Sequence, residues 1–172
     1  MFSLVIMAMS AYAEDPPSAA TVLTEAKAVA KKEGKNVMVV FHASWCGWCK
    51  KLDVFLADEK MKPIVERSFV VVHLDVMESD DKKKLENAGG GEVMLDLGGK
   101  DAGLPFTAIL DEEGKLIVNS HEKKDEPSNI GYPAAPNEIA HFLKMLKDGA
   151  PKMTEAERHA IGAWLKEKAP KI

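Results

Sequence analysis

The chain has 172 residues, of which 46% are hydrophobic and 29% are charged, as in a globular protein of one domain with at most a small appendage. Lys and Arg number 23 and Asp and Glu number 27, so the net charge is −4. This charge argues against a general nucleic-acid binder, which needs a basic surface. Cys46 and Cys49 are the only two cysteines, which excludes a multi-disulfide scaffold and a four-cysteine zinc site.

The first 13 residues have the character of an export signal. Residues 1–13 are uncharged and mostly apolar, but they are too few to span a bilayer, which takes roughly 20 apolar residues. They end in Ala11-Tyr12-Ala13, the small-x-small pattern that signal peptidase accepts. No basic residue precedes the apolar run, and a buried N-terminal strand or helix is the alternative. We predict a signal peptide over 1–13 and a periplasmic or secreted mature protein without stable membrane insertion, in an oxidising compartment.

A helix followed by a buried strand is predicted at the start of the mature chain. Ser18 is a favoured helix-capping residue, apolar residues then recur at helical spacing to about Glu33, and Gly34 is suited to end the helix. Residues 36–42 form a short, nearly unbroken apolar run rich in β-branched side chains. Such a run is typical of a central strand that is covered on both faces.

Helical and strand patterns continue to alternate beyond this strand. Apolar residues recur at i, i+3 and i+4 after Cys49, so the second cysteine is expected in the first turns of a helix. Residues 58–67 form another helical stretch, which Pro63 must kink or start. Residues 68–76 form a second β-branched strand, and Ser79 with the two acidic residues after it predicts a short helix.

The second half of the chain predicts a hairpin and two helices. Residues 89–103 are rich in glycine and are expected to form an irregular loop. Two short apolar runs, 106–110 and 115–119, flank a turn sequence and predict a β-hairpin. Helical spacing over 137–147 and a capping box at Thr154 predict the last two helices. The order of elements predicts an α/β fold, with a mixed central sheet and helices on both faces.

Cys46 and Cys49 are spaced for dithiol–disulfide exchange. At a helix start, backbone N–H groups and the helix dipole favour the thiolate of Cys46, which is the nucleophilic form. Cys49 follows one helical turn later, so it lies within reach of Cys46 and can resolve a mixed disulfide. Trp45 and Trp48 supply an apolar rim suited to an unfolded polypeptide.

Other uses of a Cys-x-x-Cys pair stay open at this point. Half of a zinc site has the same spacing, but the chain has no second cysteine pair, and its five histidines show no metal-ligand cluster. The alternatives to a redox enzyme are a non-catalytic peptide-binding module and a module that holds a soft metal such as Cu(I) on Cys46, Cys49 and His42. His42 is also a candidate for tuning the Cys46 thiolate, against the simpler role of a strand-end histidine satisfied by the backbone.

The segment 41–50, FHASWCGWCK, resembles the active-site segment of the thioredoxin superfamily. Residues 104–107, Leu-Pro-Phe-Thr, lie directly before the predicted hairpin and resemble the cis-proline loop of that family. With the strand 69–75 that follows, the pattern is similar to exported thioredoxin-like proteins of bacteria. The resemblance implies a thioredoxin-like domain over 14–147 and leaves 148–172 as a C-terminal helical extension.

The resemblance also implies roles at matched positions. Cys46 would attack a substrate disulfide and Cys49 would resolve the mixed disulfide. Pro105 would be cis, and the backbone of Leu104 would pair with the substrate chain beside the cysteines. The substrate-binding residues implied in this way are Trp45, Gly47, Trp48, Leu104 and Pro105.

The chain departs from thioredoxin beside the second cysteine. Thioredoxin has Gly-Pro between its cysteines, where this chain has Gly-Trp. The buried acid that helps to deprotonate the second cysteine of thioredoxin is matched by Val40, and its lysine partner by Val71. The usual proton acceptor for Cys49 is therefore absent. Asp53 and Glu78 are the acids considered near Cys49, although no spacing favours either.

These patterns together predict an exported thiol–disulfide oxidoreductase, a reductase or isomerase of protein disulfides, that needs no bound cofactor and no metal ion. Its partners would be protein thiol or disulfide substrates and a redox partner protein that supplies or accepts electrons. The direction of electron flow stays open, because the same Cys-x-x-Cys spacing occurs in reductants with a reduction potential of about −270 mV and in oxidants with one of about −120 mV.

Overall fold

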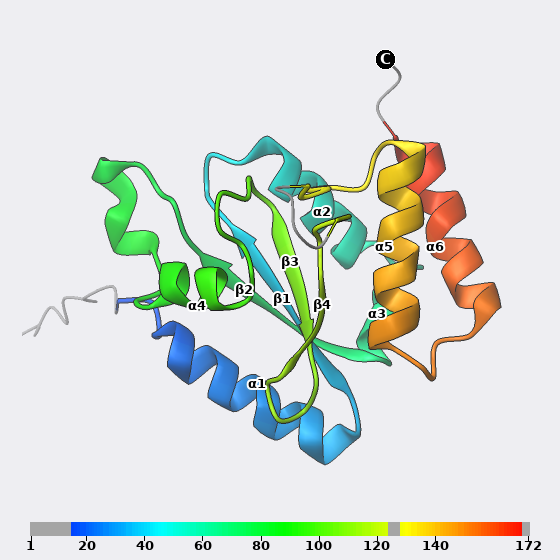
Figure 1. Ribbon diagram of the computed structural model, residues 1–172, viewed down its shortest axis with the longest axis horizontal. Helices are drawn as coiled ribbons and strands as arrows, with labels where there is room; N and C mark the ends of the chain where they lie inside the picture. The colour runs from blue at the N-terminus through cyan, green and yellow to red at the C-terminus, as the bar shows by residue number, and fades with distance from the viewer. Residues whose placement is uncertain (1–14, 124–127, 170–172) are drawn as a thin grey trace, which may run out of the picture.

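The computed structural model describes residues 15–123 and 128–169, and the predicted signal peptide lies outside them. The sheet of the described part has four strands, in the order β2 (Phe69–Asp75), β1 (Asn36–His42), β3 (Phe106–Leu110) and β4 (Leu116–Asn119) (Figure 1). β1 pairs in parallel with β2 and antiparallel with β3, and β3 and β4 form the predicted hairpin. The predicted α/β fold with a mixed sheet is therefore confirmed.

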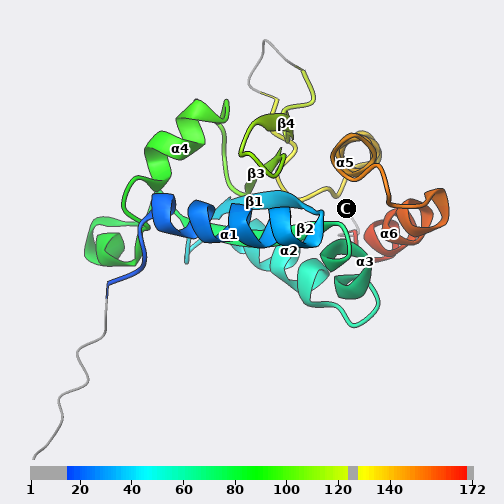
Figure 2. The same cartoon turned by 90° about the horizontal axis from the view of Figure 1, so that it is seen from below.

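Helices cover both faces of this sheet. They are α1 (Ala19–Glu33), α2 (Gly47–Ala57), α3 (Lys62–Glu66), the 3-10 helix η1 (Asp80–Leu85), α4 (Gly90–Asp96), α5 (Pro136–Gly149) and α6 (Glu155–Lys168). Buried side chains of α1 and α4 pack on one face, and those of α2, α3, α5 and α6 pack on the other. Figure 2 shows α4 and the α5–α6 pair on opposite sides of the strands. Within residues 15–123 and 128–169, every helix is too short or too polar to cross a membrane.

Strand β1 separates the two hydrophobic clusters. Val37, Val39 and Phe41 belong to the cluster beneath α1 and α4, whereas Met38 and Val40 belong to the larger cluster on the opposite face. Successive side chains of a strand point to opposite faces, so a strand buried on both sides is apolar at every position. This arrangement accounts for the unbroken apolar run in the sequence.

Local capping signals define the helix that precedes β1. Ser18 Oγ accepts a hydrogen bond from the backbone N–H of Thr21, and Gly34 adopts φ +63° at the other end. That left-handed conformation favours glycine, because a side chain there clashes with the backbone. The predicted ends of this helix are therefore confirmed. Pro63, at the second position of α3, starts that helix rather than kinking it.

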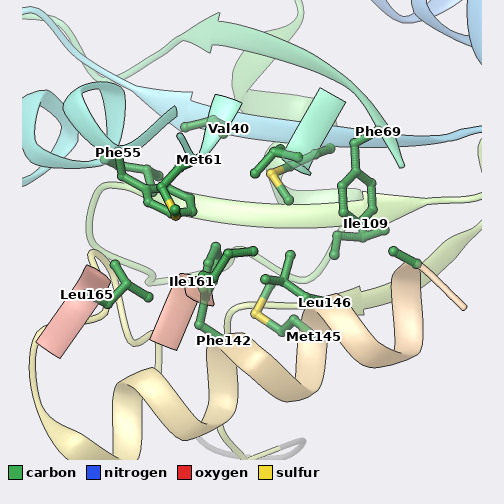
Figure 3. Close-up of a cluster of buried hydrophobic side chains, with 14 of the residues drawn as sticks. Val40, Phe55, Met61, Phe69, Ile109, Phe142, Met145, Leu146, Ile161 and Leu165 are labelled. Carbon is green, nitrogen blue, oxygen red and sulfur yellow. The ribbon is translucent and has the colours of Figure 1, made fainter. Parts of the chain in front are cut away.

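The C-terminal helix α6 packs onto the domain. Ile161 and Leu165 are fully buried in the larger cluster, which Figure 3 shows between α2, α5 and α6. Trp164 packs on the ring of Phe55 with 5.3 Å between centroids, and its Nε1 donates a hydrogen bond to Asp58 Oδ2 over 3.0 Å. The extension is thus held against α2 and the segment that follows it. Helix α5 runs through Gly149, two residues past its predicted end.

The prediction of an irregular loop over residues 89–103 is wrong in part. Residues 90–96 form α4, whose Met94 is buried, and Leu97 directly after the helix is buried in the same cluster beneath α1. Gly90 and Gly91 are the first two residues of this helix, and glycine is a poor helix former, so local propensity does not predict it. Packing of its apolar side chains against the sheet outweighs that cost. The short helix expected after Ser79 is a 3-10 helix.

Candidate active site

Cys46 and Cys49 lie at the start of α2, where they form a disulfide with an S–S distance of 2.03 Å. Cys46 is the N-cap of the helix, and its Sγ accepts a hydrogen bond from the backbone N–H of Cys49 over 3.1 Å. The same N–H and the positive end of the helix dipole would stabilise a Cys46 thiolate once the disulfide is reduced. The placement of both cysteines at a strand-to-helix junction is as predicted.

Two exposed indoles flank the buried cysteines. Cys46 is 3% exposed and Cys49 is 1% exposed, whereas Trp45 is 53% exposed and Trp48 is 48% exposed. Gly47 lies between them on the open side of the helix, and a Cβ atom there would meet nothing within 4 Å. An approaching chain therefore meets exposed apolar surface next to the disulfide.

A buried carboxylate holds the loop that carries Cys46. Glu78 is 4% exposed and accepts hydrogen bonds from the backbone N–H of Ser44 and, over 2.9 Å, from its hydroxyl. Trp45 Nε1 donates to the carbonyl oxygen of Met77 over 2.8 Å. The segment after β2 thereby fixes the two residues that precede Cys46. The sequence offers Glu78 as a candidate acid near Cys49, but both oxygens of its carboxylate accept hydrogen bonds from Ser44.

The peptide bond between Leu104 and Pro105 is cis. Leu104 packs against the buried cluster of Ala43, Cys46 and Cys49, and its backbone groups make no hydrogen bond to the residues that the structure describes. The carbonyl groups on either side are occupied, since Asn129 Nδ2 donates to Gly103 over 2.6 Å and to Pro105 over 3.0 Å. The side-chain amide of Asn129 thus orients the loop, and the loop leaves the Leu104 backbone available to pair with another chain.

Asn129 is a structural residue of the site that the sequence did not reveal. Its Oδ1 accepts hydrogen bonds from Ser120 Oγ over 2.7 Å and from the N–H of Gly131. Its side chain therefore ties the end of β4, the cis-proline loop and the approach to α5 together. Asn129 follows a polar segment, and no local pattern marks it.

Comparison with known proteins agrees with this geometry. The profile of thioredoxin-like proteins matches residues 19–112, more than half of the chain. The chain belongs to the thioredoxin-like family. It is 35% identical to a protein disulfide-isomerase of Hordeum vulgare over 68 residues, a segment that covers 40% of this chain and 13% of the barley protein. The chain also resembles the structure of a disulphide isomerase from Xylella fastidiosa Temecula1, with a TM-score of 0.53 and 22% sequence identity. The superposition covers 93% of this chain and 98% of the Xylella chain, so the two share the fold.

The thioredoxin-like protein carries a Cys-x-x-Cys pair that is joined as a disulfide at the start of α2. At the position where the thioredoxin resemblance locates a buried acid, Val40 is fully buried among apolar side chains, and Val71 packs against the same cluster. The ionisable side chains on this face lie farther along the strands. His42 Nε2 is 3.3 Å from Asp75 Oδ1, and His73 Nε2 is 3.1 Å from Asp53 Oδ1.

His42 therefore directs Nε2 at a carboxylate rather than at a cysteine sulfur. Its ring also lies beside that of His73, with 4.9 Å between centroids. Burial, and then the charge of His42, lowers the pKa of His73, against the attraction of Asp53 and Asp75. Burial raises the pKa of Asp75. In the described residues of this thioredoxin-like protein, no three His, Cys, Asp or Glu side chains are arranged to hold a metal ion.

We expect the free energy of unfolding of the His73→Gln variant to depend less steeply on pH than that of the wild type. A lowered pKa of His73 in the folded state means that the unfolded chain binds more protons than the folded chain as pH falls through about 6.5. The free energy of unfolding should therefore decrease between pH 7 and pH 5, and glutamine removes this contribution. Urea denaturation at pH 7, 6 and 5 measures the slope. The exposed His159→Gln is the control, and equal slopes for wild type and His73→Gln would contradict the assignment.

Proposed function

We propose that this thioredoxin-like protein catalyses thiol–disulfide exchange on polypeptide substrates, with Cys46 as the attacking thiol and Cys49 as the resolving thiol. The observation that carries the proposal is the Cys46–Cys49 disulfide at the start of α2, packed against Leu104 of the cis-proline loop. A disulfide can be exchanged reversibly, and it lies near the backbone of Leu104, which has no hydrogen-bond partner among the described residues; the two together provide the chemistry and a place for a chain.

The reductive half-reaction requires only the two cysteines and the substrate. The Cys46 thiolate attacks one sulfur of a substrate disulfide, so that a Cys46–substrate disulfide forms and the other substrate sulfur leaves as a thiolate. The Cys49 thiolate then attacks Cys46 Sγ, re-forms the Cys46–Cys49 disulfide and releases the second substrate thiolate. The substrate gains two electrons and the protein loses two, which a dithiol partner protein must restore. The oxidative direction is the reverse of these steps.

Substrate chains would bind across the exposed rim of the site. The backbone N–H and C=O of Leu104, which have no partner in the described residues, are positioned to pair with an extended chain. Trp45 and Trp48 would cover its side chains, and Gly47 leaves the path to Cys46 open. Pro105 holds the loop in this shape. His42 would tune the thiolate through the field of its pair with Asp75.

Export of the protein is part of the proposal. The apolar residues 1–13 with a small-x-small end support it, and so does a redox pair whose oxidised form would persist outside the reducing cytosol. A mature protein that begins at Glu14 after expression in a bacterium would agree with this processing. A protein that stays in the cytosolic fraction and still carries residues 1–13 would contradict export.

The reduction potential of the pair tests the proposed chemistry. The mature protein is equilibrated in graded glutathione buffers, its thiols are trapped with an alkylating reagent, and the adducts are counted by mass. We expect a reversible two-electron transition. A midpoint near about −270 mV would assign a reductase, and one above about −180 mV an isomerase or oxidase. A pair that stays fully reduced or fully oxidised throughout would overturn the redox proposal in favour of peptide or metal binding.

A further inference from the structure

A pocket of about 1000 Å³ opens beside the redox pair. It runs from the exposed face of α2 to the facing ends of α5 and α6, and most of its lining is apolar, including Trp48, Leu104, Ile130, Tyr132 and Ile139. Trp48 directly precedes Cys49, and Leu104 packs against the buried cluster that contains both cysteines. The pocket is therefore continuous with the surface where a substrate disulfide would react.

The wall formed by Trp48 is held in place without a ligand. The Trp48 ring stacks on Tyr132 with an interplanar angle of 19° and 6.0 Å between centroids, and Lys51 Nζ lies 5.7 Å from the Trp48 ring centroid. Tyr132 is itself 4% exposed, so its ring is fixed by the core. A preformed wall spares a ligand the cost of ordering it.

The opposite wall comes from the C-terminal helix and the segment that leads into α5. Glu138 Oε2 accepts hydrogen bonds from the N–H groups of Ala134 over 2.9 Å and of Ala135 over 2.7 Å, so this carboxylate is engaged in holding the segment. Helix α6 is fixed by the Trp164–Asp58 hydrogen bond and by an ion pair between Arg67 and Glu157. The carboxylate of Glu138 is thus satisfied internally, as is the side-chain amide of Asn129, and apart from Lys166 the surface left to a ligand is mostly apolar.

We propose that this pocket is a specificity site for a large apolar side chain, aromatic above all, on the polypeptide that exchanges its disulfide at Cys46; this inference rests on the proposed function. An extended chain advances about 3.3–3.6 Å per residue. A side chain within a few residues of the reacting cysteine therefore reaches the pocket while the backbone passes Leu104. The C-terminal helix then serves substrate choice as well as stability.

Matched peptide disulfides test this inference. Ten-residue peptides carry one cysteine as a mixed disulfide with 5-thio-2-nitrobenzoate, and tryptophan or serine occupies one position two to four residues on either side of it. Attack of the reduced Cys46 thiolate on the peptide sulfur releases the coloured thionitrobenzoate, whose appearance gives the second-order rate constant. At one of the tested positions, we expect the tryptophan peptide to react roughly ten- to a hundredfold faster than the matching serine peptide, as burial of a large apolar side chain implies.

Two tryptophan substitutions on adjacent parts of the chain locate the effect. Ala135→Trp places an indole in the pocket and should bring the ratio of the two peptide rates close to one. Ala140→Trp, on the exposed side of α5, should leave the ratio unchanged. Because both peptides are compared on the same protein, a general loss of activity cancels in the ratio.

The outcomes separate this inference from the proposed function. If the tryptophan and serine peptides react with the wild type at equal rates at every tested position, the pocket assignment is overturned and the exchange chemistry is left intact. Failure to release thionitrobenzoate from any peptide would overturn the proposed function itself. A dimer that dissociates in Ala135→Trp, together with equal peptide rates, would assign the pocket to a second copy of the chain instead.

Discussion

Replacing Cys46 with serine is expected to abolish turnover, whereas replacing Cys49 with serine is expected to trap the substrate on the protein. A serine hydroxyl cannot form a disulfide, so Cys46→Ser should reduce the catalysed rate of protein-disulfide reduction to background. In Cys49→Ser, Cys46 still attacks from its place at the α2 N-terminus, but the resolving thiol is missing. The mixed disulfide should then accumulate as one covalent adduct per protein, visible by intact mass.

The two serine variants are matched controls for each other. Both lack the Cys46–Cys49 cross-link, so any loss of stability that follows from losing the disulfide is common to them. A difference in trapping therefore reports the chemical role of each sulfur. Accumulation of adducts in Cys46→Ser, with none in Cys49→Ser, would reverse the assigned roles.

The largest expected change in stability comes from Phe55→Ala. Phe55 is fully buried, and its ring packs edge-on against Phe142 of α5 and Trp164 of α6, so one side chain of α2 anchors both C-terminal helices. Truncation of a buried phenylalanine leaves a cavity and costs about 3–5 kcal/mol. We expect the free energy of unfolding of the oxidised protein, measured by urea denaturation, to fall by that amount.

The neighbouring residue on α2 provides the comparison. Val54 is 62% exposed, so Val54→Ala removes methyl groups from the same helix without opening a cavity and should change the free energy of unfolding by less than about 0.5 kcal/mol. A Phe55→Ala effect as small as that of Val54→Ala would mean that α5 and α6 are not anchored through this ring.

Much of the fold follows from local patterns. Ser18 and Gly34 mark the ends of α1, and the apolar run over residues 36–42 coincides with β1. The second strand was predicted over 68–76 and is found over 69–75. Capping hydrogen bonds and side-chain periodicity act within one element, so the sequence of that element is sufficient to reveal them. Local patterns do not predict helix α4, because contacts of its buried side chains with the rest of the domain, and not helix propensity, stabilise it.

The spacing of Cys46 and Cys49 is likewise local, and the sequence by itself determined the redox pair and its place at a strand-to-helix junction. Tertiary structure alone decided the long-range hydrogen bonds that hold the segments around the pair. Glu78 reaches Ser44 across 34 residues of chain, Asn129 reaches the cis-proline loop across 24 to 26, and Trp164 reaches Asp58 across 106. Such contacts depend on how the elements pack in three dimensions, and no periodicity or capping signal within one element encodes them.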